Sequence, residues 1–552
     1  MTSDTGAIFQ RVSIIFSRIA MISEHSRKLY IFLLVTLLIF FHVINNYTVL
    51  TESSLASCCD AQTYFRSACR ILIDIKKNEH PWEMPTRLIR AFFSRGSNPA
   101  RSSLFLLLSL PFIYIKMTMN WAVMSNIIYL CILLFSTYGI GKRLYNSEIG
   151  IIAACLVSLF PTIFGMSRLY MMDLAMASFV ALTFYFFVLP FKLNSKKGFI
   201  IFLLSSFTVT FGVLIKESYI YFLFLLLILF LKKEFRNIYA GRALGASFLG
   251  LLFACLWYLK SQFTFKVAIA SWQAAIIDFV SSDDIFFYFK NLYHIQLMPI
   301  FFWLFIISLA YYLKKRDSLS IVSVILPLLV FSFASNNKSG RFILPIFIFI
   351  ALMIGKAVWE ITRRNKILIS ALFSLSFLQF FFVTYNIESS LPLVKLLNSP
   401  IHSSNFIISE NGLFGIVKMP NYRKTAQAII DIIGSSRAYD TVERGVHILT
   451  LVEDEEQELY FTMEELSVSK AGIASLERPF ADDFKDFVQP GRKPNLEVLN
   501  SNYVVFRRGS HFNWKHTQDY YHNFLINKDK FALIGTVLHS PGIQFDIFMR
   551  NA

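Results

Sequence analysis

Charged side chains are scarce in this chain. Asp, Glu, Lys and Arg make up 16% of its 552 residues, whereas hydrophobic residues make up 55% and Phe alone occurs 59 times. The mean hydropathy of +0.53 is too high for a water-soluble globular protein of this size, which needs more polar side chains on its surface. The composition therefore predicts an integral membrane protein.

Several signatures of other protein classes are missing as well. The sequence has no internal repeat, no low-complexity segment and no glycine-rich nucleotide-binding motif. Its histidines lack the fixed spacing of metal ligands, so solvated or hydrogen-bonded side chains are expected. The histidines concerned are His80, His294, His447, His511, His516 and His522.

The six cysteines form no zinc-binding pattern. Three of them lie in apolar runs, where a small buried side chain is expected. Cys58, Cys59 and Cys69 lie in the first long loop, for which two interpretations are open. Cys69 forms a disulfide with one of the pair, or the three thiols stay free.

Runs of Leu, Ile, Phe and Val recur at lengths close to the roughly 20 residues that a helix needs to cross the bilayer. They predict a polytopic α-helical membrane protein with about eleven transmembrane helices. The expected spans are about 29–47, 121–141, 148–166, 173–191, 198–215, 217–231, 240–258, 294–313, 318–335, 341–358 and 367–385. The apolar run 104–115 is too short to cross and contains Pro111, so we expect it to lie along the outer interface.

The net charge of +17 belongs to the membrane part, because residues 386–552 hold about 17 Lys and Arg against about 20 Asp and Glu. No basic groove pattern with interleaved aromatic residues appears, which argues against nucleic-acid binding. Lys and Arg concentrate in alternate short connections, the positive-inside pattern, which places those connections in the cytosol. They are Lys142-Arg143, then Lys192, Lys196 and Lys197, then Lys232, Lys233, Arg236 and Arg242, then Lys314-Lys315-Arg316, and Arg363-Arg364 with Lys366.

The chain divides by composition into two parts. Residues 1–385 form the transmembrane domain, with a first outer loop at 48–120 that carries interfacial helices, and residues 386–552 form an extracytoplasmic α/β domain. In the second part we expect a helix at 425–433, an alternating strand at 446–452, an acidic helix at 453–465, a strand at 502–507 and a hairpin of 531–538 with 543–550.

Ionisable residues near the membrane are informative because a charge at the bilayer centre is costly. Asp60, Asp173, the turn Lys216-Glu217 and Arg341 all fall on the predicted outer side. Carboxylates beside cations suit a reaction on a phosphorylated lipid, in which the cations hold the phosphate and a carboxylate accepts a proton. The alternative is that each residue marks a helix end, with the two aspartates as N-caps.

The first outer loop is basic. Its arginines could hold a lipid phosphate or bind anionic head groups, and head groups are the favoured interpretation for most of them. They are Arg66, Arg70, Arg87, Arg90, Arg95 and Arg101.

These residues resemble the motifs of the GT-C membrane glycosyltransferases, in particular the branch of protein O-mannosyltransferases and lipid A aminoarabinose transferase. Asp60 with Tyr64 is similar to the acidic motif of the family's first outer loop. The stretch 149–173, with Pro161, Ser167-Arg168 and Asp173, is similar to its third span and second outer loop.

Two weaker similarities complete the resemblance: Lys216 at an outer turn, with Glu217 beside it, and the helix start Arg341 to Pro345. The resemblance implies that Asp60 activates the acceptor, that Asp173 supports it or binds a metal, and that Lys216, Arg341 and Arg66 bind the donor phosphate. Tyr64, Arg168 and Glu217 would support the site.

The resemblance leaves a divalent metal at Asp60 and Asp173 open. Many relatives have two adjacent acids in the first motif, whereas Asp60 is followed by Ala61. Fixed cations can stabilise a phosphate leaving group without a metal.

The implied function is transfer of a sugar from an undecaprenyl- or dolichyl-phosphate donor to a lipid, glycan or protein acceptor at the outer face. Alternatives are a multi-span secondary transporter, a surface-polysaccharide polymerase or ligase, and an inactive scaffold of the same fold. A transporter would place charges near the membrane midplane. The expected location is a bacterial inner membrane with the C-terminal domain outside, or else the endoplasmic reticulum membrane.

The first prediction concerns the acceptor-activating base. We expect Asp60→Asn to abolish sugar transfer and to leave folding intact, because the amide keeps the shape of the side chain and cannot accept a proton. Transfer at the normal rate by a well-expressed Asp60→Asn protein would contradict the assignment.

Overall fold

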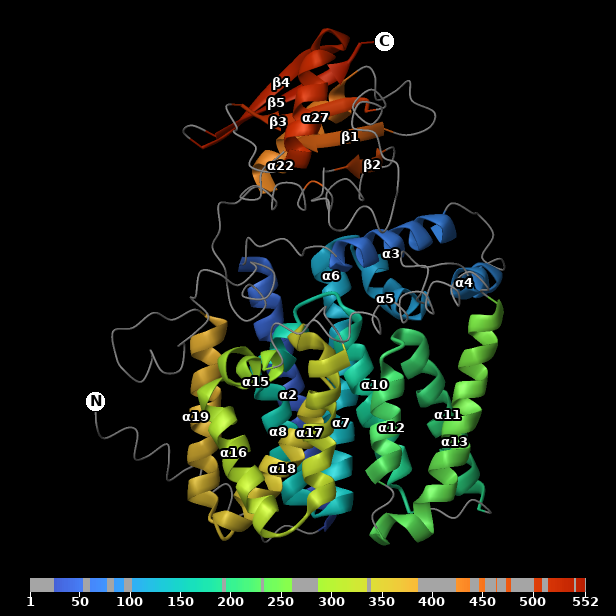
Figure 1. Cartoon of the computed structure of the whole chain (residues 1–552), viewed down its shortest axis with the longest axis vertical. Helices are drawn as coiled ribbons and strands as arrows, with labels where there is room; N and C mark the ends of the chain where they lie inside the picture. The colour runs from blue at the N-terminus through green and yellow to red at the C-terminus, as the bar shows by residue number, and fades with distance from the viewer. Residues whose placement is uncertain are drawn as a thin grey trace, which may run out of the picture. The chain divides into compact units, whose positions relative to one another are not determined.

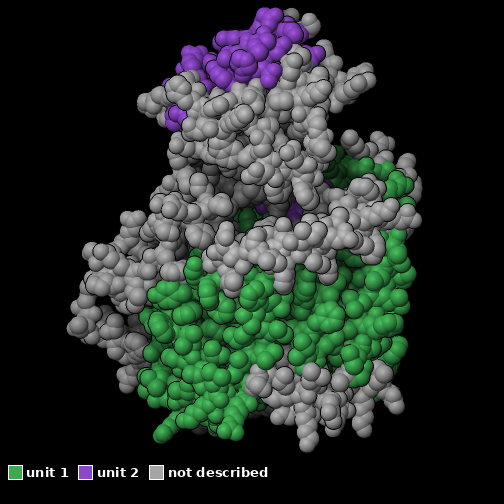
Figure 2. Space-filling view, viewed as in Figure 1, with its two compact units in different colours: residues 1–51, 70–115, 120–416 green, residues 52–69, 116–119, 417–552 purple. Residues whose placement is uncertain are grey.

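The structure is a computed structural model of the chain. It describes residues 24–52, 60–76, 84–93, 102–190, 195–229, 233–260, 286–334, 339–385, 423–436, 446–451, 463, 473–477, 501–508, 515–540 and 543–551. The chain divides into two compact units (Figure 2), one made of residues 1–51, 70–115 and 120–416 and the other of residues 52–69, 116–119 and 417–552. The predicted boundary at 385 to 386 lies outside the described residues.

The first unit is helical, and a helix occupies every span expected from the sequence (Figure 1). In chain order these helices are α2 (Glu24–Glu52), α7 (Asn126–Leu144), α8 (Ser147–Leu159), α10 (Met172–Phe187), α11 (Lys196–Ile215), α12 (Tyr219–Leu229), α13 (Lys233–Lys260), α16 (Met298–Lys314), α17 (Ser318–Ala334), α18 (Ile346–Ile361) and α19 (Lys366–Thr384). Within the described residues, five helical stretches are long and apolar enough to cross a membrane, namely Ile31–Thr51, Met119–Leu144, Lys196–Ile215, Gly241–Leu259 and Lys366–Thr384. Eleven crossings remain a prediction.

One expected span is interrupted. The run 148–166 forms two helices, α8 and α9 (Pro161–Met166), separated by Phe160 in an extended conformation. Pro161 causes the break, because a proline disfavours helical geometry in the residue before it and cannot donate a backbone hydrogen bond. Pro161 occupies a first-turn position of α9, where that missing donor costs nothing.

Short helices lie at one end of this unit: α4 (Met84–Phe93), α5 (Leu104–Ile115) and α6 (Met119–Met124). The Ser102 hydroxyl, just before α5, donates to the carbonyl of Leu214 at the last turn of α11 (2.8 Å), and Ser109 of α5 hydrogen-bonds Tyr170. Helix α5 is therefore held against the α9–α10 connection and the end of α11, and its position along the membrane interface stays a prediction.

The basic connections lie at the other end. Figure 1 shows the α7–α8, α16–α17 and α18–α19 connections together at the lower end of the helical unit, so Arg143, Arg316 and Arg364 share that end. Two further elements, α15 (Phe287–Asn291) and η3 (Leu292–Gln296), precede α16, and η4 (Gly340–Ile343) precedes α18. The assignment of the basic end to the cytosol stays a prediction.

The second unit contains a five-stranded sheet in the order β2-β1-β3-β5-β4. The strands are β1 (Val446–Leu451), β2 (Ile473–Glu477), β3 (Tyr503–Arg507), β4 (Phe531–Ser540) and β5 (Ile543–Arg550). β1 runs parallel to β2 and β3, whereas β5 runs antiparallel to β3 and β4. The strands expected at 446–452 and 502–507 and the terminal hairpin are confirmed.

Successive side chains of a strand point to opposite faces of the sheet, and a helix packs on each of these apolar faces. α22 (Arg423–Ser435) packs Ile429 and Ile433 against Tyr503 and Ile547, and α27 (Lys515–Ile526) packs Phe524 on the opposite face, against Phe506 and Phe548. The result is an α/β arrangement with two apolar layers. The acidic helix expected at 453–465 lies outside the described residues except for Met463.

Helices α7 and α8 approach closely through two glycines. A Cβ at Gly150 would lie 2.6 Å from the carbonyl oxygen of Tyr138, and one at Gly141 would lie 2.7 Å from the Cα of Gly150. Membrane helices that pack at such short range need small residues, because the backbones themselves are in contact. This contact also sets the position of the α7–α8 connection.

We expect Gly150→Ala to lower the free energy of unfolding by about 1–3 kcal/mol, the usual effect of overpacking a close contact. The measurement is the temperature at which the detergent-purified protein loses its monodisperse size-exclusion peak. Gly241→Ala in α13 is the matched control, since a Cβ at Gly241 meets nothing within 4 Å. Equal stability of Gly150→Ala and the control would contradict the close approach of α7 and α8.

Candidate active site

Two of the predicted site residues form a buried ion pair. Asp173 lies in the first turn of α10, and Lys216 caps the C-terminus of α11. Lys216 Nζ lies 2.5 Å from Asp173 Oδ1, and the two residues are only 5% and 2% exposed. Because α10 and α11 are consecutive antiparallel helices, the start of one meets the end of the other.

The interpretation of Asp173 as a helix N-cap is wrong. The N-cap of α10 is Met171, and Asp173 is the second residue of the helix. A carboxylate in the first turn of a helix is favoured by the helix dipole, but Asp173 pairs with an ammonium group from the end of another helix. Asp173 therefore serves to hold Lys216.

Arg341 comes to the same place from the turn before α18. The ring of Phe342 contacts both cations: Lys216 Nζ is 4.7 Å and the Arg341 guanidinium 5.6 Å from its centroid. Arg341 Nη1 also lies 3.9 Å from the sulfur of Met171, two residues before Asp173. The structure thus brings together Asp173, Lys216 and Arg341, as the sequence predicted. Glu217 is half-buried in the adjacent α11–α12 turn.

Arg168 has a different environment from the other cations. It is 4% exposed, and its guanidinium lies over the rings of Phe164 (4.9 Å) and Phe380 (5.6 Å). Its Nε donates to Asn46 Oδ1 (3.0 Å) and its Nη2 to Thr384 Oγ1 (3.2 Å). Burial lowers the pKa of Arg168 to about 9. This value is still above neutral pH, so the guanidinium stays protonated.

The hydrogen bonds of Arg168 join three segments that are distant in sequence: α2, the α9–α10 connection and α19. Asn46 also donates to Ser167 Oγ (2.8 Å), and Asn126 of α7 donates to the carbonyl of Leu169 (2.6 Å). The connection that leads to Asp173 is therefore anchored on several sides. Asn46, Asn126 and Thr384 were missed by sequence reasoning, although each is a polar residue in an apolar run.

The first-loop candidates lie on α3 (Asp60–Lys76), which begins at Asp60. The buried residues Ala61, Phe65, Ala68, Cys69 and Leu72 follow helical spacing, so α3 is amphipathic as an interfacial helix should be. Tyr64 is buried at 3% exposure and Arg66 is half-buried. Asp60, Tyr64 and Arg66 belong to the second compact unit, whereas Asp173, Lys216 and Arg341 belong to the first.

Cys69 is buried in α3, and Cys58 and Cys59 lie outside the described residues, so the disulfide stays a prediction. Across the part of the chain that the structure describes, no three His, Cys, Asp or Glu side chains are grouped as metal ligands would be. The ammonium of Lys216 on Asp173 also makes that carboxylate a poor ligand, because a second cation would be repelled. Asp173 therefore does not fit a metal site in this arrangement.

A double-mutant cycle tests the ion pair. We expect Asp173→Asn or Lys216→Gln alone to lower the free energy of unfolding by about 3–5 kcal/mol, because each leaves a buried charge without its partner. The double variant Asp173→Asn, Lys216→Gln should be more stable than either single variant. The readout is the apparent Tm of the purified protein. Strict additivity of the two single effects would contradict a direct pair.

Known proteins share part of this sequence and the fold of the chain. Residues 104–258 match the sequence model of the family described as dolichyl-phosphate-mannose-protein mannosyltransferase. A search of curated protein sequences found no significant match. The structure is similar to ArnT from Cupriavidus metallidurans bound to undecaprenyl phosphate, with a TM-score of 0.56, 10% sequence identity, and 93% of this chain and 97% of that chain covered.

The apo state of the same ArnT gives a TM-score of 0.52 at 11% identity, again covering 93% and 97% of the two chains. A further similar structure is the archaeal oligosaccharyltransferase AglB from Archaeoglobus fulgidus in complex with an inhibitory peptide and a dolichol-phosphate. Its TM-score is 0.48 at 11% sequence identity, with 87% of this chain and 70% of that chain covered. The family match and the similarity to ArnT agree with the resemblance seen in the charged residues, and the chain has the fold of the GT-C membrane glycosyltransferases.

Proposed function

We propose that the protein is a glycosyltransferase that moves a hexose or pentose from a polyprenyl-phosphate donor to a lipid, glycan or protein acceptor. The observation that carries the proposal is the convergence of Lys216 and Arg341 on Phe342, beside buried Asp173, at one end of the helical unit. ArnT, which has a similar fold, has been captured with undecaprenyl phosphate.

The cations would bind the phosphate of the donor. As the bond between the anomeric carbon and the phosphate oxygen breaks, negative charge develops on the leaving phosphate, and fixed cations stabilise it. Lys216 has three N–H donors, and Asp173 takes one of them in the present arrangement. We propose that a phosphate oxygen binds the Lys216 ammonium beside Asp173, whose carboxylate keeps the ammonium charged and in position. Arg341 would provide a second cation, and Arg66 a third.

The acceptor needs a base, and Asp60 is proposed for this role. An acceptor hydroxyl attacks the anomeric carbon, its proton passes to the Asp60 carboxylate, and polyprenyl phosphate leaves with the bonding electrons. A single displacement of this kind inverts the anomeric carbon. Tyr64, four residues further along α3, lies on the same side of the helix as Asp60 and would help to orient the acceptor.

The remaining candidates take supporting roles in this proposal. Arg168 would act through the α9–α10 connection as a positioning residue, because its guanidinium donates hydrogen bonds to Asn46 and Thr384. Glu217 would contribute negative charge beside Lys216. The reaction would take place at the outer face of a bacterial inner membrane, or in the lumen if the protein belongs to the endoplasmic reticulum.

The test uses mass spectrometry of polyprenyl-phosphate sugars and surface glycans in cells that lack the gene. We expect one lipid-linked sugar to accumulate and one glycan modification to disappear. The wild-type gene should restore both, whereas Asp60→Asn should not. Asp74→Asn is the matched control, because Asp74 is an exposed acid on the same helix.

The stable double variant Asp173→Asn, Lys216→Gln separates chemistry from folding. It should fail to restore transfer even though its apparent Tm recovers. An unchanged pool of lipid-linked sugars in the deletion strain would contradict the proposal and direct the work to transport assays.

A further inference from the structure

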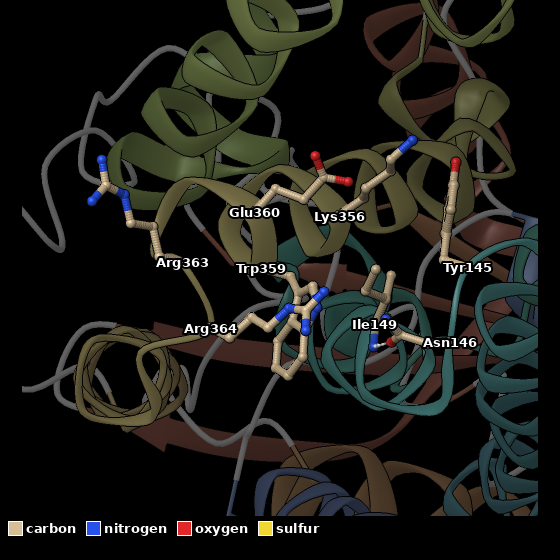
Figure 3. A pocket seen from close by; sticks show the side chains of 8 residues that line it. All are labelled: Tyr145, Asn146, Ile149, Lys356, Trp359, Glu360, Arg363 and Arg364. Atoms are coloured by element: carbon tan, nitrogen blue, oxygen red, sulfur yellow. Dashed lines mark hydrogen bonds between the residues drawn. The ribbon is translucent and has the colours of Figure 1, made fainter.

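A polar cavity lies in the helical unit, away from the candidate active site (Figure 3). Its volume is about 640 Å³, and it is lined by Tyr145, Asn146, Ile149, Lys356, Trp359, Glu360, Arg363 and Arg364. The lining comes from the α7–α8 connection with the first turn of α8, and from the last two turns of α18 with the residues that follow it. The proposed transfer reaction leaves this cavity without a role.

The cavity and the Asp173 site are at opposite ends of the unit. Asn126, at the start of α7, hydrogen-bonds Leu169 close to Asp173, whereas Tyr145 follows the end of the same helix. The 19 residues of α7 rise about 28 Å at 1.5 Å per residue. A ligand of this cavity would therefore not touch Lys216 or Arg341.

The cavity carries an excess of positive charge. Lys356, Arg363 and Arg364 line it together with a single carboxylate, Glu360, which accepts a hydrogen bond from Tyr311. Among the residues that the structure describes, none of these three cations has a carboxylate within ion-pair distance. They are therefore available to an anion from outside.

Aromatic rings hold Lys356 in place. Its Nζ lies 4.7 Å from the ring centroid of Tyr145 and 5.6 Å from that of Tyr312, and Figure 3 shows the side chain extending toward Tyr145. A ring attracts a cation through its quadrupole and adds no net negative charge. Lys356 is thus fixed in direction while its charge is not neutralised.

Uncharged donors complete the lining. Trp359 Nε1 is buried and has no hydrogen-bond partner within the described part of the chain. Asn146 is the N-cap of α8, and its side chain accepts from the backbone N–H of Ile149 (2.8 Å), so the positive end of the α8 dipole is at the cavity. The cavity combines the Lys356 ammonium, the Arg364 guanidinium and an indole N–H, whereas Figure 3 shows the Arg363 side chain extending away from them.

We propose that this cavity binds the phosphate group of an anionic ligand, presented by the head group of a membrane phospholipid. Planar guanidinium forks and an ammonium are the donors that phosphate oxygens prefer. A cavity of this volume has room for more than one phosphate, such as a glycerophosphate head group. The basic end of the unit is the end predicted to face the cytosol, where anionic lipids are concentrated.

A simpler explanation is that these cations only follow the positive-inside pattern. Arg316 provides the comparison, because it lies at the same end, after α16, and has a positive φ of 55°, like Arg363 (51°) and Arg364 (65°). Arg316 does not line the cavity. If general attraction to head groups were the whole effect, Arg316 and Arg364 would be equivalent.

The experiment measures lipid retention by native mass spectrometry. Full-length protein is purified in detergent, delipidated and mixed with phosphatidylglycerol or phosphatidylcholine. We expect the wild type to retain phosphatidylglycerol preferentially, and the variant Lys356→Gln, Arg364→Asn to bind it about tenfold more weakly or worse, because charge-assisted hydrogen bonds are lost. Arg316→Asn, the matched control at the same kind of backbone position, should bind like the wild type.

A second arm distinguishes the source of the phosphate. Inorganic phosphate and glycerol 3-phosphate are tested for a rise in apparent Tm of the delipidated protein. A rise that disappears in Lys356→Gln, without selective retention of phosphatidylglycerol, would support a phosphate site for a soluble ligand and overturn the head-group assignment.

Equal retention of phosphatidylglycerol by the wild type, the double variant and Arg316→Asn, with no effect of soluble phosphates, would overturn the site altogether. If the double variant does not give a monodisperse peak, Lys356→Gln is tested alone, because Lys356 contacts the rings of Tyr145 and Tyr312 and its loss should disturb the fold little.

Discussion

The ion pair between Asp173 and Lys216 sets the geometry at one end of the helical unit. Both side chains are almost completely buried, and in that environment each charge is tolerated only because the other lies 2.5 Å away. The start of α10 and the end of α11 must therefore meet with little freedom. The ring of Phe342 contacts the same ammonium and also the Arg341 guanidinium, which brings the turn before α18 to this point.

A buried polar network holds the α9–α10 connection, which leads to Asp173. Arg168 binds Asn46 of α2 and Thr384 of α19, while Asn126 holds the carbonyl of Leu169. In lipid or in a dry protein interior, an unsatisfied polar group is costly, so these bonds favour one arrangement of the three helices. The connection between α9 and α10 is irregular backbone, and it is tolerated at this depth because protein surrounds it on several sides.

Cations in this protein repeatedly lie on aromatic rings. Lys216 contacts Phe342, Arg168 contacts Phe164 and Phe380, and Lys356 contacts Tyr145 and Tyr312. A ring orients and partly stabilises a cation but leaves its positive charge available to an anion. The high aromatic content of the chain, 16%, is thus suited to a protein proposed to bind phosphate groups at both ends of its helical unit.

The helices, the strands β1 and β3 and the terminal hairpin could be predicted from the sequence alone, because hydropathy and alternation are properties of short segments. The break at Pro161 and the strand β2 were not predicted. The grouping of Asp173, Lys216 and Arg341 at one end followed from counting helices. Only the tertiary structure decided which polar groups pair: Lys216 with Asp173, 43 residues apart, and Arg168 with residues 122 and 216 positions away. Those pairs depend on the rotation and register of packed helices, which hydropathy does not encode.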